Sequence, residues 1–151
     1  MVASVVLLDA GPLGLVTNPN SSPQARDCTQ WLRSLVLAGT RIIVPEIADY
    51  EVRRELLRAN KPRGLALLDA LGSKAEFLPI TTPAMREAAR LWALARQQGQ
   101  PTAGDKTIDG DMILAGQALT LGVADFVVAT TNVGHLARFV PAAAWRDIVA
   151  Q

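Results

Sequence analysis

The chain has 151 residues, of which 50% are hydrophobic and 19% are charged. This size and balance are typical of a globular protein with a substantial core and exclude an intrinsically disordered one. Fifteen basic and fourteen acidic residues give a net charge of +1. The overall charge is therefore no argument for binding nucleic acid or anionic lipid, and any such surface must be local.

Cysteine content and hydropathy exclude further classes of protein. The single Cys28 excludes an internal disulfide and a cysteine metal cluster. We expect it to be a small apolar side chain within a helix. The N-terminal apolar run has no basic lead-in, and no segment reaches the roughly 18 apolar residues that a membrane span needs. We therefore expect a soluble, cytoplasmic protein with no membrane partner.

The first third of the chain predicts two buried strands with a helix between them. The run Ser4–Leu8 is apolar and rich in β-branched residues, ends at Asp9, and is followed by "AGP", which indicates a turn. The segment "SSPQARDCTQWLRSLVLAG" predicts a helix capped by Ser22 and stopped by Gly39. Its apolar positions recur at spacings of three and four: Cys28, Trp31, Leu32, Leu35 and Val36. Arg41–Pro45 is the second strand.

The middle of the chain predicts three helices and one short strand. The range 46–59 alternates as a helix with Ile47, Tyr50 and Leu57 on or near one face. The range 63–71 is a second helix, ended by Gly72, and "EFLPI" is a short strand. The segment "TPAMREAARLWALARQQG" predicts a helix capped by Thr82.

The last third predicts one more helix and one more clear strand. The stretch "TIDGDMILAG" (107–116) opens a helix that Gly122 stops, "DFVVAT" is a strand, and the tail is short and mixed. Strands that alternate with helices indicate an α/β fold, a three-layer α/β/α sandwich with a mainly parallel sheet. We find no repeat or linker and expect a single domain, residues 1–151.

Acidic and amide side chains fall where ligands bind in such sheets. Open parallel sheets bind ligands outside the carboxyl ends of their strands. Asp9 lies one residue past the first strand, and Asn132 lies just past the strand Phe126–Ala129. Asp109 and Asp111 open the helix that leads into that strand, and Glu51 lies in the helix after the second strand. These four segments can bring oxygen ligands to one sheet edge.

Each of these residues also has an ordinary structural interpretation. Asp9 and Asp109 can cap helices or turns, and Asp111 is favourable in a first helical turn. Glu51 can pair with Arg54 on a solvated face, and Asn132 can be a turn residue. Crowded carboxylates, however, repel one another unless a cation is present. Oxygen ligands without His or Cys suit Mg²⁺ or Mn²⁺, which would activate water for phosphodiester cleavage.

Four motifs in order resemble the PIN-domain family, close to the VapC-type toxins of bacterial toxin–antitoxin pairs. They are "VVLLDAG", "PEIADYEVRREL", "DGDMILAGQALTLG" and "VVATTNVGHL", and they span nearly the whole chain. The resemblance implies a PIN-like fold and a metal-dependent ribonuclease. It also implies acidic residues that bind Mg²⁺ or Mn²⁺, an antitoxin that covers the site, and self-association as a homodimer.

The resemblance assigns roles residue by residue. Asp9, Glu51 and Asp111 match the family's catalytic and metal-binding acids, with Asp109 as an auxiliary ligand that also caps the helix. Asn132 stands at the family's fourth metal position, which is commonly Asp. The family also often has Ser or Thr within two residues of the first aspartate, whereas this chain has Ala10 and Gly11.

Other kinds of site fit the sequence less well. His135 is the single histidine and has no G-x-S-x-G elbow to accompany it, so a Ser-His-Asp enzyme is disfavoured. The "DAGPLG" loop lacks the Lys of a phosphate-binding P-loop. A haloacid-dehalogenase phosphatase would need a second Asp where Gly11 stands. In the basic stretch 53–63, Arg54 and Arg58 share the helix face of Glu51 and suit an RNA backbone, although a solvated helix explains them as well.

The sequence thus leads to one preferred function and one alternative. The preferred function is an Mg²⁺- or Mn²⁺-dependent endoribonuclease that acts as a toxin, with RNA as substrate and an antitoxin as partner. The alternative is a PIN-like module that binds RNA or protein without cleaving, because Asn132 weakens the acidic site. A metal-dependent phosphatase is a more distant third reading.

Overall fold

Five parallel strands form the central sheet. The computed structural model describes residues 1–20, 22–99 and 109–150. The strands are β1 (Val5–Leu8), β2 (Arg41–Pro45), β3 (Glu76–Leu78), β4 (Phe126–Thr130) and β5 (Ala142–Ala144). Their order across the sheet is β3-β2-β1-β4-β5, and every neighbouring pair is parallel. The predicted parallel sheet is therefore confirmed, and the chain order reverses between β1 and β4.

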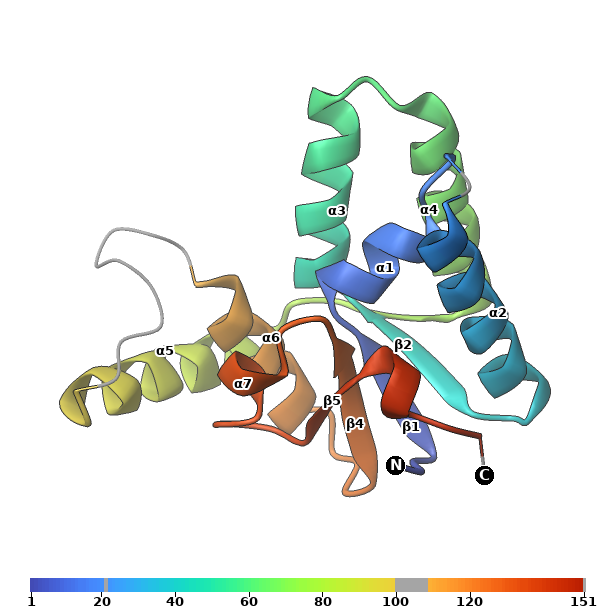
Figure 1. Cartoon of the computed structure of the whole chain (residues 1–151). Coiled ribbons are helices and arrows are strands. Elements are labelled where there is room, and N and C mark those ends of the chain that lie inside the picture. Colours follow the sequence, from blue (N-terminus) through green and yellow to red (C-terminus); the bar gives the residue numbers. More distant parts are fainter. Residues whose placement is uncertain (21, 100–108, 151) are drawn as a thin grey trace.

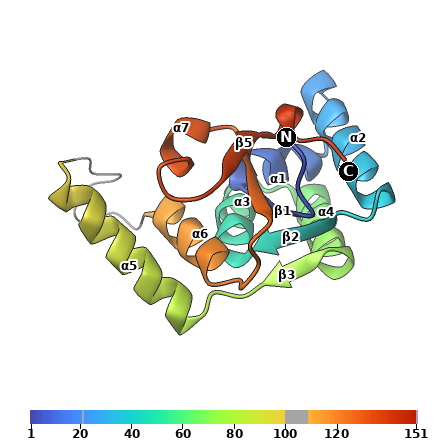
Figure 2. The same cartoon turned by 90° about the horizontal axis from the view of Figure 1, so that it is seen from below.

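Helices cover both faces of the sheet, as Figure 1 and Figure 2 show. One group comprises α1 (Ala10–Val16), α2 (Pro23–Leu37), α3 (Glu46–Arg58) and α4 (Pro62–Lys74). The other comprises α5 (Thr82–Gln97), α6 (Gly110–Leu119) and α7 (Val133–Leu136), and a short 3₁₀ helix, η1 (Trp145–Asp147), follows β5. The predicted three-layer α/β/α arrangement is thus what the structure shows.

The strands supply apolar side chains to two separate cores. Val6 and Leu8 of β1 point into the core beneath α1, α2 and α4. Val5 and Leu7 point the opposite way, into the core beneath α5 and α6. Alternate strand residues face opposite sides, so a continuous apolar run fills both cores at once. Cys28 belongs to the first core and is fully buried, as predicted.

Helix caps explain several element boundaries. Ser22 accepts a hydrogen bond from the Ala25 amide and caps α2, as its position in the sequence predicts. For α5 the prediction is wrong by one residue: Thr81, not Thr82, accepts from the Ala84 amide. The first helical turn tolerates the following Pro83, because amides in that turn have no partner within the helix.

Two elements and two helix ends differ from the prediction. The segment after Asp9, predicted as a turn, is the helix α1. The fourth helix runs from Pro62 to Lys74, so Gly72 lies inside it and does not end it. The helix α6 ends at Leu119, before Gly122. The tail, predicted as mixed, contains α7, β5 and η1.

The buried face of α3 also differs from the prediction. Its buried residues are Ile47, Ala48 and Val52, whereas Tyr50 and Leu57 are exposed. Ile47 joins the core under α5 and α6, and its neighbour Ala48 joins the other core. The helix α3 therefore packs between the two helix layers, directly after the carboxyl end of β2. Within the described ranges, no helix is long and apolar enough to cross a membrane.

Candidate functional site

The candidate site lies at the switch point of the sheet, where β1 and β4 run side by side and the strand order reverses. Asp9 directly follows β1, and its backbone amide donates to the Ala129 carbonyl of β4 at 3.0 Å. Thr130 is the last residue of β4 and is fully buried. A crevice at such a switch point is the usual ligand site of an open parallel sheet.

Both oxygens of the Asp9 carboxylate are held by hydrogen bonds. The Ala10 amide donates to Oδ1 at 2.8 Å, and Asp9 is thereby the N-cap of α1. The Thr130 hydroxyl donates to Oδ2 at 2.7 Å. The capping interpretation of Asp9 is therefore correct, and the same residue still lies at the predicted sheet edge. A carboxylate has further lone pairs, so these two bonds leave capacity for a ligand.

The two aspartates that open α6 have different positions. Asp109 is the N-cap, and its Oδ1 accepts from the Met112 amide at 3.3 Å. Asp111 lies in the first turn, and its Oδ2 is 3.6 Å from Nδ1 of His135. Asp109 therefore caps the helix as predicted, while Asp111 faces α7.

The glycine between these aspartates allows α3 to approach α6. A Cβ built on Gly110 would lie 3.0 Å from Oε1 of Glu51 and 3.2 Å from both Cδ and Oε2. Such contacts are tighter than almost all real Cβ contacts, so a side chain at position 110 would press on the Glu51 carboxylate. The glycine thus lets the Glu51 carboxylate lie directly against the start of α6, between the two aspartates of the sequence.

The four acids affect one another's ionisation. Burial raises the pKa of Glu51, and the charge of Asp9 raises it further. Asp111 and Asp109 add to this effect, and among the described residues Arg54 opposes it. The pKa of Asp111 is also raised, first by burial and then by the charges of Asp9 and Asp109. Three segments distant in sequence therefore share one zone of negative potential.

His135 is a site residue that sequence reasoning did not assign. It lies on α7, and its charge, when present, lowers the pKa of Asp111. Its Nδ1 atom is buried and has no hydrogen-bond partner in the described part of the chain. Its position five residues after the end of β4 places it near the carboxyl edge of the sheet. The sequence does not show, however, whether the imidazole ring points toward the acids.

Asn132 lies beside this cluster but is exposed. It is the N-cap residue of α7 without a side-chain capping bond, and its backbone amide donates to Thr130 Oγ1 at 2.9 Å. The structure brings Asp9, Glu51, Asp109 and Asp111 together. Asn132 joins their hydrogen-bond network through its backbone N–H and not through its side-chain carboxamide. A ligand role for the Asn132 side chain stays a prediction.

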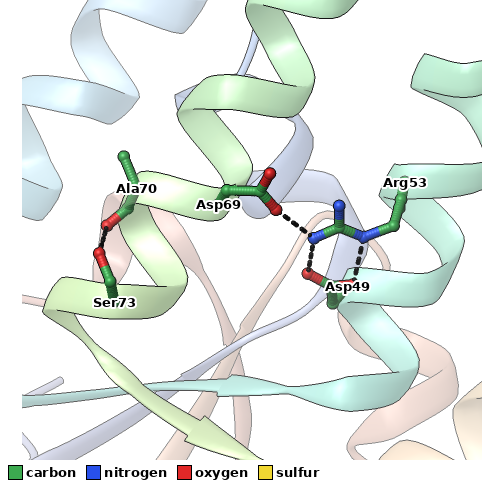
Figure 3. A network of polar contacts seen from close by, with 5 residues as sticks. All are labelled: Asp49, Arg53, Asp69, Ala70 and Ser73. Carbon is green, nitrogen blue, oxygen red and sulfur yellow. Dashed lines mark hydrogen bonds and ion pairs between the residues drawn. The ribbon is translucent and has the colours of Figure 1, made fainter.

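The basic residues of α3 have partners of their own. Arg58 pairs with Glu55 at 2.7 Å, so the solvated-helix interpretation describes it in this structure. Arg54 lies over the Tyr50 ring, with its guanidinium carbon 5.3 Å from the ring centroid. Arg53 binds both Asp49 and Asp69 of α4 (Figure 3). A groove of about 420 Å³ runs past Glu51 to Arg58. RNA binding by Arg54 and Arg58 stays a prediction.

The donor set fits a hard divalent cation in its chemistry. The described acids offer carboxylate oxygens only, the ligands that Mg²⁺ and Mn²⁺ prefer, and their mutual repulsion would be relieved by a positive ion. In residues 1–20, 22–99 and 109–150, however, no three His, Cys, Asp or Glu side chains stand in an arrangement that could hold a metal ion. Gathering them around an ion would need rotation of their side chains.

No protein-family model matches this sequence, and no curated protein matches it either. Solved structures do match. The chain is similar to one in VapBC2 from Rickettsia felis bound to a DNA fragment from their promoter, with 16% identity, a TM-score of 0.69, and coverage of 93% of this chain and 98% of that chain.

Two further structures give the same result. A chain of VapBC-1 from nontypeable Haemophilus influenzae has 17% identity and a TM-score of 0.69, with coverage of 95% of this chain and 99% of that chain. A chain of FitAcB from Neisseria gonorrhoeae has 19% identity and a TM-score of 0.67, with coverage of 94% and 99%. At these identities the likeness is one of fold. The chain has the three-layer PIN-like fold that the sequence predicts.

Proposed function

We propose that this protein is an Mg²⁺- or Mn²⁺-dependent endoribonuclease and the toxin of a type II toxin–antitoxin pair. The observation that carries the proposal is the cluster of Asp9, Glu51, Asp109 and Asp111 at the switch point of a PIN-like sheet. Glu51 and Asp111 have raised pKa values, first because both are partly buried and then because neighbouring carboxylates are close. A fold does not need such a costly arrangement for stability, whereas a cation site does.

Each acid has a definable part in this reaction. Asp9, Glu51 and Asp111 would hold the ion, with Asp109 as an auxiliary ligand and cap, and Asn132 as a neutral oxygen ligand at the rim. When bound, Mg²⁺ or Mn²⁺ supplies an activated water and stabilises negative charge on the phosphate oxygens. Arg54 and Arg58 would contact the RNA backbone. The exposed Arg58–Glu55 pair is weak enough for a phosphate to compete with it.

Partners follow from the proposed class of protein. We propose a cognate antitoxin that covers the acidic edge, in keeping with the similarity to chains of VapBC and FitAcB structures. We also propose a homodimer, because α2 exposes Val36 and Leu37, the latter to 88%. Sedimentation at tens of micromolar and co-purification with the product of an adjacent gene test these two partners. A strict monomer, or no bound product, would count against the respective partner.

Cleavage of a mixed RNA pool tests the function directly. We expect cleavage with Mn²⁺ or Mg²⁺, none in EDTA, recovery when the metal is restored, and a large loss in Asp111→Asn. Cleavage that survives EDTA, or that is equal in Asp111→Asn, would reject the proposal.

One alternative has an observation in its favour. Asn132 stands where the PIN-domain family commonly has Asp, and its side chain is exposed and makes no capping hydrogen bond. A site with one acid fewer suits a PIN-like module that binds RNA or protein without cleaving it. RNA binding without cleavage in the same assay, under saturating Mn²⁺, would support this alternative.

A further inference from the structure

A groove leads from the acidic edge along α3. It has a volume of about 420 Å³, lies between α1 and α3, and runs from Glu51 to Arg58 and Lys61. Figure 1 shows the reason: α3 starts at the carboxyl end of β2, beside α1, and then runs away from the sheet to its connection with α4. Sites for small ligands have volumes of about 300–1,000 Å³. This α3 groove is therefore large enough to hold part of a ligand that is bound at the acidic edge.

The walls of the α3 groove are mainly apolar and leave it open. Val52 and Leu56 line it from α3, and Ala10 and Gly14 line it from α1. Val52 belongs to the core and Leu56 packs against it, so this wall is fixed. A Cβ built on Gly14 would meet no neighbouring atom within 4 Å, so the glycine leaves empty space where other residues would place a side chain. An apolar part of a ligand gains stability by filling such a space.

The end of the α3 groove that is far from the acidic edge is basic. The segment 58–63, which joins α3 to α4, contains Arg58, Lys61 and Arg63 and no acid, and all three side chains are exposed. Arg58 pairs with Glu55 on the rim of the groove. Lys61 and Arg63 form no ion pair within the described ranges. Cations without an acidic partner attract an anionic ligand to this end of the groove.

Single-stranded RNA combines the two features that this groove can recognise. Each nucleotide has a base whose face is apolar and a phosphate that carries a negative charge. Proteins bind single strands by placing basic side chains along the backbone and by packing other side chains against the bases. An apolar peptide would use the walls of the groove but would leave Lys61 and Arg63 without a partner. The charge of the groove therefore favours RNA over such a peptide.

We propose that the α3 groove is a subsite for the RNA strand next to the bond that is cleaved. A base packs against the apolar walls at Gly14, and Lys61 and Arg63 bind phosphates, so the strand leaves the acidic edge along α3. The inference rests on the proposed function, because RNA is its substrate, and it extends the RNA contacts beyond Arg54 and Arg58.

The chain offers matched variants for both parts of the subsite. Gly14 has an ordinary helical backbone conformation, so Gly14→Leu can fill the groove without backbone strain. Gly14→Ala is its control, because a single methyl group favours the helix and leaves most of the groove open. Arg63→Gln and Lys61→Gln each remove one cation from the basic end. Lys74→Gln is their control, because Lys74 is an exposed cation at the opposite end of α4 from Arg63.

The experiment measures binding of a short fluorescein-labelled single-stranded RNA by fluorescence anisotropy, in EDTA and at several salt concentrations. We expect Gly14→Leu to weaken binding by about fivefold or more, because one base loses its packing. Its melting temperature should not fall, and Gly14→Ala should bind like wild type. Lys61→Gln and Arg63→Gln should each lower the slope of log affinity against log salt by about 0.7, the value for one phosphate contact of a single strand. Lys74→Gln should leave affinity and slope unchanged.

Several results would overturn the proposal. They are no RNA binding by wild type, wild-type affinity in Gly14→Leu, or salt slopes of Lys61→Gln and Arg63→Gln equal to that of Lys74→Gln. A Gly14→Leu protein that binds RNA normally but no longer co-purifies with a partner protein would assign the groove to that protein instead. If Gly14→Leu does not fold, the two salt slopes decide.

The same assay separates this inference from the proposed function, because binding in EDTA needs neither metal nor cleavage. Wild type that binds RNA through the α3 groove but cleaves none with Mn²⁺ would reject the proposed nuclease and keep the subsite. Metal-dependent cleavage by wild type, together with unchanged RNA binding in Gly14→Leu, would keep the nuclease and reject the subsite.

Discussion

Two groups of carboxylates begin two residues apart on α3 and have opposite surroundings. Asp49 binds the Arg53 guanidinium through both oxygens, at 2.9 and 3.0 Å, and Arg53 also reaches Asp69 of α4 at 2.8 Å (Figure 3). Glu51 instead faces Asp9, Asp109 and Asp111, and within the described part of the chain no hydrogen bond or salt bridge holds its carboxylate.

The difference separates a structural cluster from a functional one. The Asp49–Arg53–Asp69 group contains its own cation, and its bonds tie α3 to α4; the same bonds raise the pKa of Arg53 above its ordinary value. The acidic edge concentrates negative charge; among the described residues, Arg54 lowers the pKa of Glu51 and His135 lowers that of Asp111. A group that contains its own cation needs no further ion, whereas the acidic edge would be stabilised by a cation from outside.

The largest expected effect comes from removing one charge at the acidic edge. Asp9→Asn and Asp111→Asn should each lower metal-dependent RNA cleavage by about a hundredfold or more. Loss of a residue that only hydrogen-bonds to a metal ligand already costs about 10- to 100-fold, and loss of the ligand itself costs more. Asp111→Asn should also slightly raise the melting temperature in EDTA, because repulsion between carboxylates is relieved. Asp9→Asn should not, because it replaces one of the two carboxylate oxygens that accept from the buried Thr130 hydroxyl and the Ala10 amide. Asp109→Asn should be milder, because Asn caps a helix about as well as Asp. Near-wild-type cleavage by either of the first two variants would show that the site is wrongly assigned.

Breaking the Asp49–Arg53–Asp69 cluster should lower stability and leave activity unchanged. Arg53→Met should lower the free energy of unfolding by about 1–2 kcal/mol, because it leaves Asp49, whose side chain is 16% exposed, without its charged donor. RNA cleavage should not change. Arg58→Met, which breaks a pair whose arginine is 74% exposed, is the stability control and should cost less than about 1 kcal/mol. Urea unfolding measures both, and equal losses would remove the distinction between the pairs.

Adding a charge to the acidic edge should sharpen the contrast. In Asn132→Asp we expect Mn²⁺ affinity to rise by about fivefold, which is roughly 1 kcal/mol for an exposed ionic contact. Activity should persist at lower metal concentration, and stability in EDTA should fall. Isothermal titration measures the affinity. An unchanged value would mean that position 132 points away from the site and that Asn132 is a turn residue.

The smallest effect is a pH dependence of the metal-free protein. The folded-state pKa values of Glu51 and Asp111 are raised, mainly by burial, so folding favours their protonated forms. Their contribution to stability is therefore full below the ordinary carboxylate pKa and is lost as pH rises through the raised values. Urea unfolding in EDTA from about pH 4 to 7 should show a steeper decline for wild type than for Asp111→Asn. Parallel curves would contradict this.

The sequence predicts the sheet and the acidic edge well. Apolar β-branched runs locate β1, β2 and β4, and the rule for parallel sheets then places Asp9 at their carboxyl edge. The sequence does not predict α1, because "AGPLGLV" contains two glycines and a proline, residues that indicate a turn. That helix depends on the Asp9 cap and on burial of Leu13, which are tertiary features.

The missed parts of the site have a similar cause. The strand β5 is Ala142–Ala144, without β-branched residues, and it forms because β4 offers a parallel edge. Thr130 contacts Asp9, and His135 contacts Asp111, only because their side chains point toward these acids. The path of the turn between β4 and α7 determines that direction. Spacing places a residue near a sheet edge, but it does not show which hydroxyl reaches which carboxylate.

Calorimetric titration of Mn²⁺ into EDTA-treated, dialysed protein tests the central claim most directly. Wild type has both carboxylate clusters intact. Asp111→Asn disrupts the acidic edge, and Arg53→Met disrupts the Asp49–Arg53–Asp69 cluster. We predict saturable Mn²⁺ binding to wild type, an unchanged affinity in Arg53→Met, and a loss of about tenfold or more in Asp111→Asn. No binding to wild type, or the same affinity in all three proteins, would contradict the claim that the acidic edge is a cation site.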